Sequence, residues 1–308
     1  MELFYYSICI IYFLFADLNS KKSFYVVLGY IIITRTSGFE SDFLYSYVNY
    51  LELTPYRILT SPFYYREILY YLPTVLIYKV IPNPTITFIL IDIMVLLLIR
   101  RSFKKLGLPS LTLVLFYLIF PSVLGFQNVY RQFLAISFMV IIASNINWFK
   151  FILPVLLHNM TAVFFPVIIR NTLWKITSVI TLALGLIIFQ NLKSEIDSGQ
   201  GDFTSLYFII IVINLLIGLF LESLCKRKIK KSPIQLLINL SIVATVITII
   251  LSGSQSERLL MSILTFQILL NLPLILNSFK QKKLAYKFYG LIFILPSLIF
   301  PSVKQFIG

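Results

Sequence analysis

Apolar runs near the length that crosses a bilayer recur along the whole chain and constrain its fold most. A helix of about 20 apolar residues spans a membrane. The runs cover residues 3–18, 24–34, 62–81, 84–99, 108–125, 132–147, 151–169, 174–190, 204–222, 234–251, 258–277 and 285–303. Because 59% of residues are hydrophobic and 12% are charged, we predict an all-α polytopic membrane protein. It would form one integral membrane domain, 1–308, with about 10–12 transmembrane or re-entrant helices.

The positive charges indicate how the runs are oriented. The net charge is +14, and Lys and Arg cluster in short loops beside the runs, which is typical of cytoplasmic loops rather than of a nucleic-acid surface. These loops lie near 100–107, 225–232 and 279–284. If every run crossed, the first two loops would face opposite sides. The conflict disappears if 62–81 and 151–169 fold back as outer-face or re-entrant segments. Ten crossings then remain, both termini face outside, and an outer-face segment covers about 35–81.

An Arg-Gln pair begins the run after Gly125-Phe126-Gln127-Asn128. In this topology Arg131 and Gln132 occupy the first turn of a helix that enters the membrane from outside. Unpaired backbone N–H groups and the positive end of the helix dipole favour an anion there. A guanidinium strengthens such a site. We therefore expect a phosphate group near Arg131.

Two more arginines are expected on the same side. Ser254 and Glu257 have capping-box spacing, which places Arg258 in the first turn of another helix entering from outside. Arg35 ends the second run. Each of the three could instead snorkel to lipid phosphate. However, all three oppose the bias toward cytoplasmic positive charge, which favours a functional anion site.

The only histidine and several acids are the candidate general bases. His158, followed by Asn159, interrupts the run 151–169, and it is either a packing residue or a functional one. Asp42, Glu40 and Glu67 are candidate bases because partial burial raises a carboxyl pKa. A solvated outer face explains Asp42 equally well and Glu40 better. Asp92 lies inside an apolar run and must face protein or water.

Other motifs narrow the classes of function. The Tyr-rich segment beginning at Phe63 is typical of an interfacial aromatic belt, and its rings also suit sugar stacking. The sequence contains no Walker loop, GxGxxG, CxxC or HExxH motif. A lone His without a Cys cluster does not favour a structural metal. We therefore predict no metal and no cofactor.

An ordered set of residues resembles the EpsG and Wzy group of bacterial polysaccharide polymerases over most of the chain. Members typically carry an Arg after the second span, a downstream Glu, a basic inner loop, an Arg-Gln pair, a His in a short hairpin and a late Arg. The corresponding positions here are Arg35, Gly38, Asp42, Tyr45, Glu67, 100–105, Arg131, Gln132, His158, Ala162 and Arg258. Departures occur after Glu67, where the usual Pro and Gly are missing, and in the His158 hairpin.

The resemblance implies a membrane glycosyltransferase with a GT-C-like architecture in the bacterial cytoplasmic membrane, with its active site facing outside. It would join oligosaccharide repeat units carried on polyprenyl diphosphate, in contact with membrane lipids and with a flippase and a chain-length regulator as further partners. Asp42 or His158 would be the base, and Arg131 would stabilise the leaving diphosphate. The remaining substrate-binding positions would be Arg35, Gln132, Arg258, Glu67, Tyr45 and Asn159.

Three other functions fit parts of the pattern. A lipid-linked glycan flippase would need polar groups along a pathway, often within internal repeats, whereas the polar residues here gather on one face. An O-antigen ligase would use a similar donor, but it would be expected to have a larger outer domain. A membrane acyltransferase could use His158 as its base.

Overall fold

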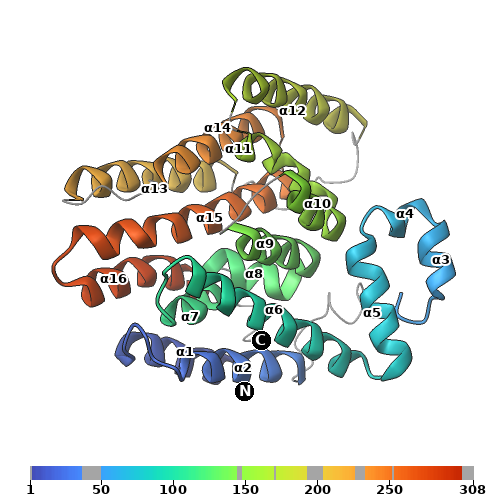
Figure 1. Cartoon of the computed structure of the whole chain (residues 1–308), viewed down its shortest axis with the longest axis horizontal. Helices are drawn as coiled ribbons and strands as arrows, with labels where there is room; N and C mark the ends of the chain where they lie inside the picture. Colours follow the sequence, from blue (N-terminus) through green and yellow to red (C-terminus); the bar gives the residue numbers. More distant parts are fainter. Residues whose placement is uncertain are drawn as a thin grey trace. The chain divides into compact units, whose positions relative to one another are not determined.

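The computed structural model describes residues 2–36, 50–143, 148–169, 171–192, 204–225, 233–251 and 253–299. These residues form helices joined by turns and contain no strand (Figure 1), which confirms the all-α prediction. The chain divides into two compact units. Unit 1 comprises Met1–Thr161 and Lys287–Gly308, and unit 2 comprises Ala162–Tyr286.

Unit 1 holds most of the helices. Its elements are α1 (Glu2–Phe15), α2 (Ser23–Thr36), α3 (Pro55–Thr60), α4 (Pro62–Tyr65), α5 (Ile68–Val80), α6 (Pro84–Lys105), α7 (Leu111–Leu118), α8 (Phe120–Asn128), α9 (Tyr130–Ile142), α10 (Trp148–Leu157) and α17 (Pro296–Ile299). Helix α9 packs against α6, α8 and α10. Aromatic rings fill the core around it, where Tyr117, Phe126 and Phe133 contact one another.

Unit 2 consists of α11 (Phe165–Ile168), α12 (Thr172–Leu192), α13 (Thr204–Leu224), α14 (Ile234–Ile250) and α15 (Ser254–Ser278). Helix α13 packs against both α14 and α15. Between α15 and α13, Asn271 Nδ2 donates to the backbone oxygen of Asn214 at 3.1 Å and to its Oδ1 at 3.2 Å. The 3-10 helix Asn159–Phe164 and helix α16 (Lys282–Ile294) each include residues of both units.

Local sequence signals explain the ends of α6. The Asn83 side chain accepts from the Ile86 N–H at 3.1 Å, and Pro84 occupies the first turn, an arrangement that satisfies a free N–H and fixes φ for the helix. After the last turn, Gly107 adopts φ 70° and Leu108 N–H donates to Phe103 O at 2.9 Å. This is a glycine-dependent helix stop.

One break within the predicted runs is confirmed, and two further breaks were not predicted. The run 151–169 breaks at His158, as expected. The run 62–81, predicted only to fold back without crossing, breaks at Glu67. The run 108–125, predicted as one span, is instead interrupted at Ile119, which has extended backbone (φ −62°, ψ 139°). Pro121 explains this interruption. Inside a continuous helix a proline has no N–H to donate to the carbonyl four residues earlier and its ring clashes with that carbonyl, whereas proline is tolerated in a first helical turn.

The predicted capping box at Ser254 and Glu257 is wrong. The N-cap of α15 is Gly253, at φ 73° and ψ −161°, and Ser254 is already inside the helix. Glycine adopts this positive φ without the steric penalty that other residues meet. Arg258 is therefore the fifth residue of α15, just beyond the first turn in which it was predicted. Its side chain is exposed.

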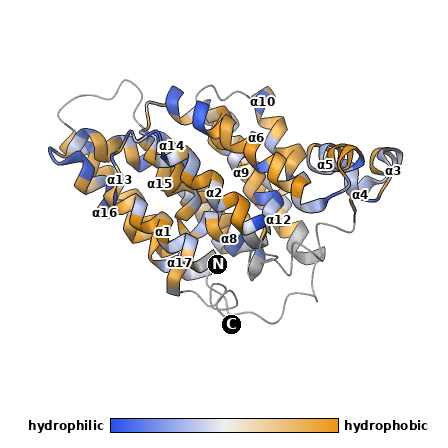
Figure 2. Cartoon of the chain, turned by 90° about the horizontal axis from the view of Figure 1, so that it is seen from below, coloured by the Kyte–Doolittle hydropathy of each residue, from blue (hydrophilic) through white to orange (hydrophobic). Residues whose placement is uncertain are grey.

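Helix lengths bear on the membrane prediction. Among the described residues, two helices are long and apolar enough to cross a bilayer, Thr204–Leu224 and Gln255–Ser278, and the second is mostly buried within the protein. A core helix of a soluble protein meets the same criteria. Most of the other apolar helices have 10–17 residues, and 14 residues extend only about 21 Å. Figure 2 shows apolar colour along much of α1, α2, α6 and α13, whereas α3 and α4 are mostly pale blue.

Candidate functional site

Two helix breaks in unit 1 present polar side chains to each other. At the first, α4 ends and Glu67 (φ −126°, ψ 42°) becomes the N-cap of α5, with its carbonyl accepting from the N–H groups of Tyr70 and Tyr71 at 2.9 and 3.2 Å. The backbone therefore fixes Glu67 at a corner. Its side chain is only 1% exposed.

The second break fixes His158. Its N–H donates to Pro154 O at 3.0 Å and closes α10. Its own carbonyl accepts from the Thr161 N–H at 3.0 Å and from the Thr161 hydroxyl at 2.7 Å. These bonds start the 3-10 turn and hold the imidazole at the point where the chain changes direction. The ring is 15% exposed.

Arg131 comes from a third corner. Val129 separates α8 from α9, so Arg131 is the second residue of α9, as the sequence predicts. Its side chain is 28% exposed, and it is therefore accessible from outside the protein.

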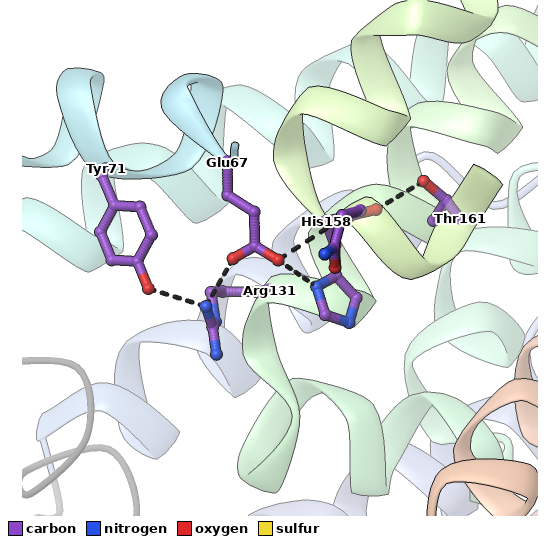
Figure 3. Close-up of polar contacts among 6 residues, drawn as sticks. Glu67, Tyr71, Arg131, His158 and Thr161 are labelled. Carbon is purple, nitrogen blue, oxygen red and sulfur yellow. Dashed lines mark hydrogen bonds and ion pairs between the residues drawn. The ribbon is translucent and has the colours of Figure 1, made fainter. Parts of the chain in front are cut away.

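The Glu67 carboxylate joins these three elements (Figure 3). Glu67 Oε2 accepts from Arg131 Nη1 at 2.5 Å, and Oε1 lies 2.7 Å from His158 Nδ1. The Asn159 N–H donates to Oε1 at 3.4 Å, and the Tyr71 hydroxyl accepts from Arg131 Nη1 at 2.7 Å. We refer to Glu67, Arg131 and His158 as the cluster.

The contacts of the cluster set its protonation. Burial alone raises the pKa of the Glu67 carboxyl, but the hydrogen bond from His158 and the charge of Arg131 outweigh it, so this pKa is lowered. An ionised carboxylate only accepts hydrogen bonds, so His158 Nδ1 carries the proton that faces it. In the neutral ring, Nε2 then bears the lone pair. A carboxylate that orients an imidazole in this way is the arrangement of a general base.

Arg35 lies in a different surrounding from the one expected of a substrate-binding residue. Its Nε donates to Asp92 Oδ2 at 2.8 Å, and the two side chains are 0% and 1% exposed. Tyr130 donates its hydroxyl hydrogen to Asp92 Oδ1 at 2.7 Å. The Arg35 guanidinium is therefore enclosed by protein and is not accessible from the surface. The interaction also gives Asp92 the protein partner that its position in an apolar run required.

The other predicted site residues have different positions. Gln132 is buried, and Asn159 joins the cluster through its backbone. Glu67 is enclosed by protein groups, so the structure gives it a role in holding His158 and Arg131 rather than the expected contact with substrate. Glu40, Asp42 and Tyr45 lie outside the described residues. Arg258 belongs to unit 2.

No direct sequence signal indicates which residues are partners in the cluster. Tyr71 was one of many tyrosines in an aromatic segment, and the pairing of Glu67 with His158 joins residues 91 positions apart. The one available signal was the presence of isolated polar residues within apolar runs. Each such residue needs a partner when it is buried, so it indicates that a partner exists but not which one. Among the described residues, no group of three or more His, Cys, Asp or Glu could hold a metal ion.

Comparisons with protein-family models, with curated proteins and with solved structures find no match for this chain. The geometry of the cluster and the sequence pattern are therefore the basis for assigning a function.

Proposed function

We propose that this chain is a membrane glycosyltransferase that joins lipid-linked oligosaccharide repeat units into a polysaccharide at the outer face of the bacterial cytoplasmic membrane. The cluster is the observation that carries the proposal. In it the buried Glu67 carboxylate contacts His158, the only histidine of the sequence, and also pairs with Arg131, whose side chain is partly exposed. The resemblance to the EpsG and Wzy polymerases supplies the substrate class.

The cluster supplies a base. His158 Nε2 takes the proton of an acceptor hydroxyl while that oxygen attacks the anomeric carbon of the donor sugar. The bond from this carbon to the diphosphate oxygen breaks, and polyprenyl diphosphate leaves with the electron pair. Glu67 keeps Nδ1 protonated and stabilises the imidazolium that forms. General base catalysis of this kind contributes about 10²- to 10⁴-fold to the rate.

The cluster also supplies a cation for the leaving group. Arg131 stands in the first turn of α9, where the helix dipole adds positive potential. Fixed donors placed where charge develops lower the barrier, and loss of one commonly costs about 10²- to 10³-fold in rate.

Exposed apolar surface supports the membrane setting. Helix α12 displays a series of large apolar side chains, each more than half exposed: Leu173, Trp174, Ile176, Ile180, Leu184 and Ile188. A contiguous surface of this kind marks contact with a membrane or another protein. A bilayer is also the place where a polyprenyl tail resides.

The test uses a deletion strain complemented with wild type or with a variant, after confirming that each protein reaches the membrane. Glycans released from the lipid fraction are separated by length. We expect a ladder with wild type and single repeat units with His158→Ala or Arg131→Gln. Arg57→Gln is the matched control, because Arg57 is an exposed arginine of α3, and it should preserve the ladder.

Each alternative has its own outcome. A full ladder with His158→Ala would refute the proposed base. Loss of all exported units in the deletion strain would indicate a transporter. An intact ladder that lacks acyl groups would indicate an acyltransferase that uses the same Glu67 and His158 pair.

A further inference from the structure

The corner between α8 and α9 determines where Arg131 points. Val129 (φ −129°, ψ 54°) ends one helix and begins the other, and its own side chain makes no capping hydrogen bond to the first turn of α9. Its backbone bonds are ordinary helical ones, from Val129 N to Gly125 O at 3.1 Å and from Phe133 N to Val129 O at 3.0 Å. Local sequence signals therefore do not fix the direction in which α9 leaves the corner. Tertiary contacts must do so.

Arg35 of α2 contacts both sides of this corner. Its guanidinium carbon lies 4.1 Å from the ring centroid of Phe126 in α8 and 4.5 Å from that of Tyr130 in α9. Both distances are within the range of cation–π attraction, which is strongest away from water. One cation thus holds the last turn of α8 and the first turn of α9.

Asp92 of α6 completes the arrangement. One carboxylate oxygen accepts from Arg35 Nε at 2.8 Å, and the other accepts from the Tyr130 hydroxyl at 2.7 Å. Both bonds are buried and charge-assisted, the stronger kind of hydrogen bond. Asp92 therefore fixes both the Arg35 guanidinium and the Tyr130 ring relative to α6.

We propose that Asp92, Arg35 and Tyr130 form a positioning clamp that sets the first turn of α9 and thereby holds Arg131 against Glu67. Tyr130 and Arg131 are consecutive residues, so their side chains leave the helix about 100° apart. A rotation or shift of this turn moves both. The clamp concerns the site of the proposed function, and only its catalytic consequence rests on that function.

The choice of variant separates positioning from folding. Removing Asp92 or Arg35 would leave a buried charge without its partner, which is strongly destabilising. Tyr130→Phe is milder, because it deletes one hydroxyl and leaves both the aromatic ring and the Arg35–Asp92 pair. Tyr117→Phe is the matched control. Tyr117 is also fully buried in unit 1, and its hydroxyl makes no hydrogen bond to the described residues.

The only histidine provides a direct measurement. Full-length protein labelled with ¹⁵N-histidine and held in lipid nanodiscs gives ring signals from His158 alone, which report the contact of its Nδ1 with Glu67. We expect Arg131→Gln to move these signals because it removes a second partner of Glu67. Tyr130→Phe should move them in the same direction, and Tyr117→Phe should leave them unchanged.

A double variant tests whether Tyr130 affects His158 through Arg131. If Tyr130 acts through Arg131, Tyr130→Phe combined with Arg131→Gln gives the same signals as Arg131→Gln alone. A further shift in the double variant would overturn the clamp, as would wild-type signals in Tyr130→Phe or in Arg131→Gln. The readout needs no substrate. If the signals respond as expected while glycan ladders are normal in every variant, the clamp stands and the proposed function fails.

Discussion

Replacing Glu67 by glutamine should inactivate the cluster without removing its volume. In wild type the carboxylate accepts from two side-chain donors, Arg131 Nη1 at 2.5 Å and His158 Nδ1 at 2.7 Å. A carboxamide has one acceptor oxygen and one NH₂ group. It can keep Arg131 only by donating to His158, which forces the proton of the neutral ring onto Nε2, or it can keep His158 only by turning its NH₂ group toward Arg131.

Both arrangements have measurable costs. The wrong tautomer removes the base, and in a serine protease the equivalent change lowers kcat about 10⁴-fold, so we expect polymerisation to fall about 10³- to 10⁴-fold. Loss of one buried charge-assisted hydrogen bond costs about 1.5 to 3 kcal/mol. We expect the smaller end because Arg131 is 28% exposed and water can replace part of the contact.

Two assays check this prediction. Glycan ladders measure polymerisation, and ¹⁵N spectra of the single histidine separate its two neutral tautomers. Glu52→Gln, at an exposed position, is the matched control and should behave as wild type. Wild-type ladders together with an unchanged tautomer in Glu67→Gln would refute the assignment of Glu67 as the group that orients His158.

Three further predictions concern stability, measured by thermal unfolding of the full chain in detergent. Because the folded-state pKa of Glu67 is lowered from its ordinary 4.5, the stability that its carboxylate contributes is present above that value and is lost as pH falls through the folded-state pKa. Glu67→Gln should therefore reduce the loss of stability at acid pH, and an unchanged dependence of the unfolding midpoint on pH would contradict this. Gly218→Ala should destabilise unit 2 by about 1 to 3 kcal/mol, because the added Cβ would lie 2.8 Å from Asn271 Oδ1. Its control Gly185→Ala meets no atom within 4 Å and should stabilise its helix by up to about 1 kcal/mol, so equal effects at the two positions would refute the packing argument. Gly107→Ala should cost about 1 kcal/mol, because φ is 70° with open space around it, and an unchanged midpoint would show that the turn relaxes.

Much of the helical architecture could be predicted because it depends on signals within a few residues. The apolar runs end at polar residues or glycines. The breaks at Glu67 and His158 coincide with polar residues inside otherwise apolar segments. Arg131 could be placed in a first helical turn for the same reason. The break at Ile119 carried a comparable signal in Pro121, because proline is favoured in the first turn of a helix and excluded from its interior.

The pairings could not be predicted because they depend on tertiary distance. Arg35 was expected near a ligand, since a single arginine at the end of a run gives no indication of its partner. Its partner Asp92 is 57 positions away, within another apolar run. The two charges are both explained once they are considered together, because a buried charge is stable only beside a compensating one. A test for opposite charges in separate apolar runs would have suggested this pair.

The charge of the cluster matches the reaction proposed for it. With a neutral His158 ring, the negative Glu67 and positive Arg131 cancel, so the site carries no net charge before the reaction, and their mutual attraction offsets part of the cost of desolvating each ion. When His158 takes the acceptor proton, the cluster becomes positive by one charge. At the same moment the departing diphosphate gains negative charge. Positive potential therefore increases where the transition state needs it, and this differential stabilisation is what accelerates a reaction. Arg131 balances Glu67 at rest, and in the proposed reaction it also faces the leaving group. The proposed clamp of Asp92, Arg35 and Tyr130 would fix the turn from which it acts.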